Sequence, residues 1–142
     1  MRGGSPLLSF CAGVWSARVN DQNQWIQADL QTTHRIESVT TQGRPGYNQR
    51  VTSYFVSYSQ DGTRWVNIPT LYDGNTDSNT KVANILPDNI EARYVRLRPN
   101  TWIRHISMRF DVTGCAVHGK MPLNTLTVLF HYGQLFPLHT YM

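Results

Sequence analysis

The sequence predicts an all-β fold, a distorted antiparallel β-barrel or sandwich, from three observations. Apolar and polar residues alternate in several short runs, which is the periodicity of a strand with one buried face. Clusters of Gly, Pro, Asn and Asp separate these runs, and no segment has the periodicity of a helix of useful length. Of the 142 residues, 15% are charged and 40% are hydrophobic, including four Trp, seven Tyr and five Phe. That aromatic content can fill the core of a single domain and is not typical of a disordered chain.

The first two predicted strands cover residues 25–30 and 51–59. WIQADL places Ile26, Ala28 and Leu30 on one face, and VTSYFVSYS repeats the pattern with Tyr54, Val56 and Tyr58. Side chains alternate between the two faces of a strand, so each of these sets is predicted to face the core.

Two more strands are predicted at 93–98 and 103–112. RYVRLR turns Val95 and Leu97 inward, between arginines that point outward. IRHISMRFDV is the most regular run. It is predicted to bury Ile106, Met108, Phe110 and Val112 and to expose His105, Ser107, Arg109 and Asp111.

Turn residues connect these strands. QGRPGYNQ at 42–49 contains Gly-Arg-Pro-Gly, and Asp61-Gly62 is a residue pair that favours a tight hairpin. The polar segment 72–79 places Asp73, Asn75 and Asp77 at alternate positions, as at the start of an EF-hand loop. The glycine and glutamate that an EF-hand requires do not follow, so a turn held by side-chain-to-backbone hydrogen bonds is the preferred interpretation.

The sequence contains no recognisable catalytic motif. Nucleophile elbow, zinc-protease, P-loop and dinucleotide-binding patterns are all absent. His34 and His105 have no partner base nearby in the sequence, and Cys11, close to Trp15, has no histidine in a cysteine-hydrolase context. We therefore expect no enzymatic activity, no metal site and no cofactor.

The net charge of +4 is carried by eleven Arg and only two Lys. Arginine favours fork-like contacts to carboxylates, phosphates or aromatic faces. The arginines form no consecutive block, which makes a nucleic-acid partner the weakest interpretation. No run of eighteen apolar residues predicts a transmembrane helix.

The sequence resembles the discoidin domain, also called the coagulation factor 5/8 type C domain. The segments that carry the resemblance are NQWIQADL (23–30), VTTQGR (39–44), YFVSYSQDGTRW (54–65), LYDGNTDSNTKV (71–82) and RYVRLRPNTWIRHISMRFDVTGC (93–115). The resemblance covers 11–115 as the domain, leaving 1–10 as an unmatched N-terminal segment and 116–142 as a C-terminal appendage.

This resemblance implies a galactose-binding-domain-like jelly roll without catalytic residues, placed outside the cell or secreted. Such domains bind cell-surface glycans, anionic phospholipid head groups or proteins through loops at one end of the barrel. Two of those loops map onto 11–22 and 43–50. Their expected ligand contacts are Trp15, Ser16, Arg18, Asn20, Arg44, Tyr47, Asn48 and Arg50. Core packing at the base of its loop is the equal alternative for Trp15, whereas Tyr47 is expected to be exposed.

The resemblance also assigns structural roles to Trp25, Asp29, Trp65, Trp102, Arg109 and Cys115. Arg109 is expected to pair with a carboxylate in the sheet. The N-terminal strand and first binding loop of the family have no counterpart here, nor does the cysteine that pairs with Cys115. We therefore expect Cys11 and Cys115 not to be joined by a disulfide.

Two other functions remain open. The domain could be the carbohydrate-binding module of a larger enzyme, although no Pro- or Thr-rich linker flanks it. It could also bind nucleic acid. That function ranks last, because it needs aromatic and basic residues interleaved on one exposed sheet, and here those residues alternate with core positions.

Overall fold

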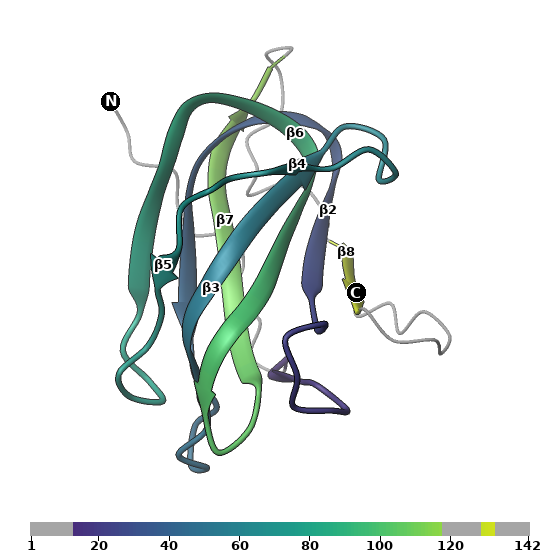
Figure 1. Cartoon of the computed structure of the whole chain (residues 1–142). Coiled ribbons are helices and arrows are strands. Elements are labelled where there is room, and N and C mark those ends of the chain that lie inside the picture. Colours follow the sequence, from purple (N-terminus) through teal and green to yellow (C-terminus); the bar gives the residue numbers. More distant parts are fainter. Residues whose placement is uncertain (1–12, 118–128, 133–142) are drawn as a thin grey trace.

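A computed structural model of the chain describes residues 13–117 and 129–132, which form an antiparallel all-β structure (Figure 1). The predicted fold class is confirmed. The strands are β1 (Trp15–Ser16), β2 (Ile26–Gln42), β3 (Arg50–Ser59), β4 (Val66–Asn67), β5 (Tyr72–Asp73), β6 (Val82–Ile103), β7 (Ser107–Ala116) and β8 (Leu129–Tyr132). Within the described ranges there is no helix long and apolar enough to cross a membrane.

The long strands β2 and β6 bend and take part in both layers of the barrel (Figure 1). The strands follow the order β1-β7-β2-β6-β3-β4, with β5 on β3 and β8 on β2. The first part of β2 pairs with β8 and with residues 94–97 of β6, whereas its second part pairs with β7 and with residues 82–92 of β6. Positive φ angles of 70° at Gln31 and 67° at Asn89 mark the bends. Both strands therefore turn the sheet back over its own core.

The core lies between the two layers and follows the predicted alternation. The apolar residues that the sequence places inward on 25–30, 93–98 and 103–112 are all buried, as are Tyr54 and Val56 on β3. Tyr58 is partly buried and packs against the core. Period-two patterning therefore predicts the inner face correctly.

The outer face departs from the predicted pattern, because several of its polar side chains are also buried. Gln27 and Asp29 are 8% and 5% exposed, since arginines of β6 lie over them. Ser107 is fully buried and its hydroxyl bonds with Ser16 and Gln49. The prediction that Ser107 is exposed is wrong, because a contact from a distant strand covers it.

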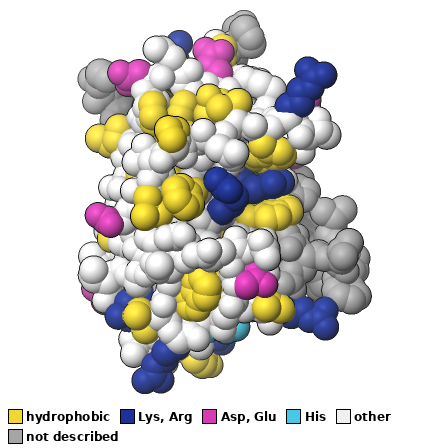
Figure 2. Space-filling model, viewed as in Figure 1, with side chains coloured by type: hydrophobic (Ala, Val, Ile, Leu, Met, Phe, Trp, Pro, Cys, Tyr) yellow, Lys and Arg dark blue, Asp and Glu magenta, His cyan; other side chains and the backbone are white. Residues whose placement is uncertain are grey.

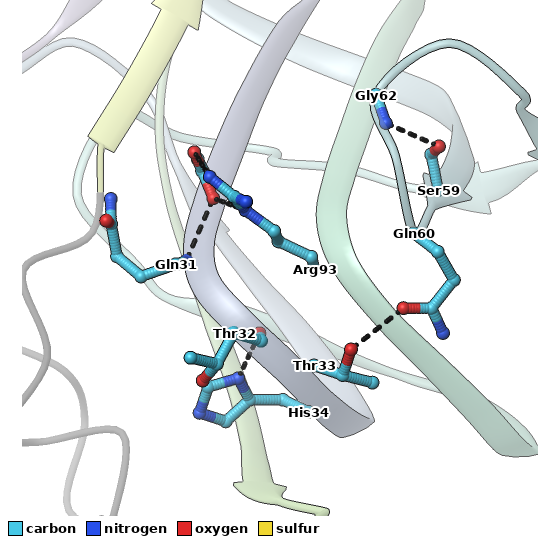
Figure 3. A network of polar contacts seen from close by, with 9 residues as sticks. Gln31, Thr32, Thr33, His34, Ser59, Gln60, Gly62 and Arg93 are labelled. Atoms are coloured by element: carbon cyan, nitrogen blue, oxygen red, sulfur yellow. Dashed lines mark hydrogen bonds and ion pairs between the residues drawn. The ribbon is translucent and has the colours of Figure 1, made fainter.

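Loops gather at the two ends of the barrel (Figure 1). At one end, polar contacts hold the bend of β2 (Figure 3). Arg93 forms a bidentate ion pair with Asp29, at 2.8 and 2.9 Å, and Thr33 donates to Gln60 at 2.9 Å. His34 is buried there, and its Nδ1 lies 2.8 Å from the carbonyl of Thr32.

β8 belongs to the segment predicted as an appendage. It pairs with the start of β2, with Ile26 opposite Tyr132 and Asp29 opposite Leu129. The predicted N-terminal segment 1–10 and Cys11 lie outside the described residues.

Candidate functional site

Four loops converge at the other end of the barrel, drawn at the bottom of Figure 1, and we call this region the loop end. It comprises residues 17–25, 43–49, 74–81 and 104–106. Barrel-end loops carry binding residues in many β proteins, because the sheet below holds them in place. The first two loops overlap the segments predicted as binding loops.

Loop 43–49 forms a tight turn that presents an aromatic ring. Arg44 and Gln49 form an isolated β-bridge, and the Arg44 N–H donates to the Gln49 carbonyl at 2.9 Å. Gly46 has φ of 76°, a conformation that glycine adopts without strain. Tyr47 is 56% exposed, as predicted, and the Arg44 guanidinium carbon lies 3.6 Å from its ring centroid.

Arg50, another expected ligand contact, lies at the start of β3. Its Nη1 donates to the Asn48 carboxamide at 2.6 Å, and its Nε is buried without a hydrogen-bond partner among the described residues. The cation over the Tyr47 ring is Arg44. The bridge of Arg44 with Gln49 turns the Arg44 side chain to the ring, whereas Arg50 already belongs to β3.

Loop 74–81 is fixed by its own polar side chains. The Asn75 amide donates to the carbonyls of Thr41 and Thr80, both at 2.9 Å. Asp77 accepts from the Thr80 hydroxyl and N–H, both at 2.6 Å, and from the Asn79 N–H at 2.9 Å. These bonds, that of the Thr80 hydroxyl first, hold the pKa of Asp77 below its ordinary value. The preferred interpretation of this segment, a turn held by side chains, is confirmed.

Arg109 ties two of the loops together. From β7 its Nε donates to the Gly43 carbonyl at 3.0 Å and its Nη2 to the Ser78 carbonyl at 3.1 Å. A carboxylate partner was expected, but the two ion pairs within the described residues join Arg35 to Glu91 and Arg93 to Asp29. The expected partner is therefore wrong, and Arg109 instead sets the spacing between loops 43–49 and 74–81.

The predicted contacts in loop 11–22 separate into buried and exposed groups. Trp15 is 7% exposed and pairs with Met108 across β1 and β7, so its ring belongs to the core and not to a contact surface. Ser16 is exposed, although its hydroxyl lies 2.8 Å from that of Ser107. Arg18 is exposed at the loop end.

A fourth loop at 104–106 was not predicted from the sequence. His105 Nε2 lies 2.7 Å from the Ala17 carbonyl, and its Nδ1 lies 3.0 Å from the Asn20 amide. The side-chain oxygen Oδ1 of Asn20 accepts the Ile106 N–H at 2.9 Å. Arg104, between Ile103 and His105, is exposed with φ of 61°. Nothing local in the sequence indicates this contact, because the pairing of β1 with β7 creates it.

Comparison with known proteins gives the same family as the sequence motifs. The model of the F5/8 type C domain family matches residues 6–112. The chain belongs to this family. It is 38% identical to porcine (Sus scrofa) coagulation factor VIII over 109 residues, which is 72% of this chain and 5% of that protein. It is 39% identical to the mouse (Mus musculus) EGF-like repeat and discoidin I-like domain-containing protein 3, over 75% of this chain and 24% of that protein.

Solved structures show the same fold. Discoidin II of Dictyostelium discoideum superposes with a TM-score of 0.70 at 30% identity, over 79% of this chain and 49% of that chain. A Clostridium perfringens structure in complex with GalNAc-β-1,3-galactose has a TM-score of 0.61 at 21% identity, over 70% of this chain and 74% of that chain. F5/8 type C domains are typically non-catalytic binding modules. This chain spans a small part of the curated relatives it matches.

Three of the six residues assigned structural roles in this F5/8 type C domain, Trp25, Asp29 and Trp65, contact arginines of β6. The guanidinium of Arg96 lies between two indole rings, 3.9 Å from the Trp25 centroid and 3.7 Å from that of Trp65. It also donates twice to the Gln27 carboxamide oxygen, at 3.0 and 2.8 Å. Burial lowers the pKa of Arg96, and the nearby charge of Arg98 lowers it further.

The other structural assignments have different outcomes. Asp29 is held by Arg93, and Trp102 packs against the core. Cys115 is exposed with a free thiol, so it forms no cross-link within the described part of the chain. The pairing of Cys11 stays a prediction because Cys11 lies outside that part. Among the described residues, no group of three or more His, Cys, Asp or Glu side chains could hold a metal ion.

Proposed function

We propose that this F5/8 type C domain is a non-catalytic, extracellular binding module that recognises a cell-surface ligand through its loop end. One observation supports this most directly. Tyr47 is exposed, stacked by Arg44, on a loop that Arg109 and the Arg44–Gln49 bridge hold in place. A fixed aromatic ring is a favourable anchor, because little conformational entropy is lost when it binds.

Other exposed side chains of the loop end indicate the chemistry of the ligand. Arg18 and Arg104 are exposed at the same end of the barrel, and each can donate paired hydrogen bonds to an anionic or hydroxylated group. The ring supplies contact area, and the guanidinium groups supply orientation. The ligand classes are a cell-surface glycan, an anionic phospholipid head group or a protein.

Recognition of a glycan or protein is favoured over insertion into a bilayer. The tip of loop 43–49 consists of Pro45, Gly46, Tyr47 and Asn48, all exposed. It lacks the paired Leu, Phe or Met that burial in the acyl region would require. Contact with a lipid would therefore be limited to the head group.

A second candidate is the carbohydrate-binding module of a larger enzyme. The structure from Clostridium perfringens that shares the fold is in complex with the sugar GalNAc-β-1,3-galactose. The loop end would serve the same purpose in either setting. The chemistry of the larger protein would lie in another domain.

Binding arrays of glycans and of anionic vesicles, probed with the full chain, test the proposal. A ligand found there is then titrated against the double variant Tyr47→Ala, Arg44→Ala. We expect affinity to fall by at least about tenfold, the size of a binding hot spot. The control is Val66→Ala, which removes an exposed apolar residue from β4. Unchanged affinity of the double variant would show that the loop end is not the site.

A further inference from the structure

The outer face of β6 carries an arginine whose charge no side chain of the described residues neutralises. Arg98 is partly exposed, and its Nε is buried without a hydrogen-bond partner within that part of the chain. Its ring contact is with Phe55, its partner in the register of β3 and β6, at 5.6 Å from guanidinium carbon to ring centroid. A buried polar atom without a partner needs an explanation, because leaving it unpaired costs free energy.

Neither ion pair of the described residues involves Arg98. Asp29 is engaged by Arg93, and the other ion pair of the described residues joins Arg35 to Glu91. Arg96, two residues from Arg98 on the same face of β6, uses a neutral acceptor, Gln27. Two guanidinium groups therefore lie on one face without a carboxylate between them.

Arg96 provides a rigid neighbour for Arg98. The indoles of Trp25 and Trp65 cover both faces of its guanidinium, and Gln27 fixes the edge that carries Nε and Nη2. The influence of the Arg98 charge on the pKa of Arg96 shows that the two charges interact. Figure 2 shows basic side chains lying among hydrophobic ones near the middle of this side of the molecule.

We propose that Arg98, beside the Trp25–Arg96–Trp65 stack, forms a second binding site that takes the sulfate groups of a sulfated glycan chain. This site lies on the sheet face, separate from the loop end. A guanidinium group donates two parallel hydrogen bonds to an oxyanion, and the repulsion between two fixed cations decreases when an anion lies between them. The rings alongside present area to a sugar.

The position of the arginines favours a glycan over an acidic peptide. An extended peptide binds a sheet mainly by adding a strand to an open edge. β6 pairs with β2 on one side and with β3 on the other, in continuous register through residues 94–97. The backbone groups there are already used, so a ligand on this face contacts side chains alone.

The test uses the full chain and a heparin-derived octasaccharide as the probe. We expect Arg98→Gln to weaken binding about tenfold. The matched control is Arg35→Gln, which changes the net charge equally but lies in the exposed pair with Glu91, and it should change affinity less than about twofold. Equal losses in the two variants would mean unspecific attraction and would overturn the proposal.

Four further measurements separate the alternatives. Arg98→Lys keeps the positive charge but not the planar guanidinium group that donates paired hydrogen bonds. Its affinity should therefore lie between that of the unchanged protein and that of Arg98→Gln. Desulfated heparin should not bind, and its binding would refute the assignment of a sulfated glycan. An oligo-aspartate peptide should not compete with the octasaccharide, and competition would refute the same assignment. The loop variant Tyr47→Ala, Arg44→Ala should keep its affinity for the octasaccharide. If the loop variant lost its affinity for the octasaccharide while Arg98→Gln bound it normally, the anion would lie at the loop end. That outcome would reject the sheet-face site but not the proposed function.

Discussion

The loop end and the outer face of β6 use the same pair of groups, an arginine and an aromatic ring, with different consequences. On loop 43–49 Arg44 lies over one ring, that of Tyr47, and more than half of the tyrosine surface faces solvent. On β6 Arg96 lies between two rings, and Gln27 takes its hydrogen bonds. The first arrangement leaves the ring open to a partner, whereas the second engages Arg96 itself in structural contacts and leaves Arg98 beside it as the cation proposed to bind.

The difference shows that the supporting element, more than the residue types, separates a binding group from a structural one. A residue in the middle of a sheet has neighbours on both sides, and they enclose its side chain. A residue at the tip of a turn has neighbours only below it. A cation–π contact at an exposed site contributes about 0.5–1 kcal/mol, and one removed from water contributes about 2 kcal/mol.

The largest effect should come from breaking the stack on the sheet face. Arg96→Ala removes two ring contacts and leaves the partly buried Gln27 without its donor, so we expect the free energy of unfolding to fall by roughly 2–4 kcal/mol. The loop counterpart Arg44→Ala should cost less than about 0.5 kcal/mol, as surface substitutions usually do. Urea denaturation of both variants measures the comparison. Equal losses would show that the two stacks do not differ as described.

A smaller effect is expected where the sheet supports the loops. Arg109→Gln removes charged hydrogen bonds to the Gly43 and Ser78 carbonyls, which should lower the free energy of unfolding by about 2 kcal/mol. Loops 43–49 and 74–81 would then lose their fixed spacing, so affinity for a loop-end ligand should also fall a fewfold in fully folded protein. A thermal melt and a titration at low temperature separate the two effects. Weaker folding with unchanged affinity would restrict Arg109 to a role in stability.

The smallest effect should come from the turn around Asp61, which positions Trp65 against Arg96. Asp61 accepts the N–H groups of Arg64 and Thr63, both at 2.8 Å, and these bonds lower the pKa of its carboxyl group from the ordinary 3.8. A lowered pKa gives stability that is present above pH 3.8 and is lost as the pH falls through the lower value. Asp61→Asn should therefore lower stability near neutral pH by a small amount and flatten the acid side of the stability profile by the same amount. An unaltered acid limb in pH-dependent melts would contradict this.

The sequence alone was informative where the structural cause is local. Alternation predicted the inward residues of four strands, because successive side chains of a strand must point to opposite faces. Asp61-Gly62 predicted the hairpin between β3 and β4, since the Gly62 φ of 77° suits glycine. The glycines around Tyr47 predicted its exposure, which the structure confirms. The ligand contacts of the loop end stay a prediction.

Only the tertiary structure decided the features that depend on residues far apart in the chain. Alternation cannot show that Gln27, Asp29 and Ser107 are buried, because arginines of β6 and residues of other segments cover them. It cannot choose between Arg44 and Arg50 as the partner of Tyr47, nor bring loop 104–106 to the loop end. The sequence by itself determined which apolar residues of the four predicted strands face the core, through the geometry of each strand, but it did not predict the full length of β2 and β6. The register between strands decided which cation meets which ring, because that contact depends on neighbours dozens of residues away.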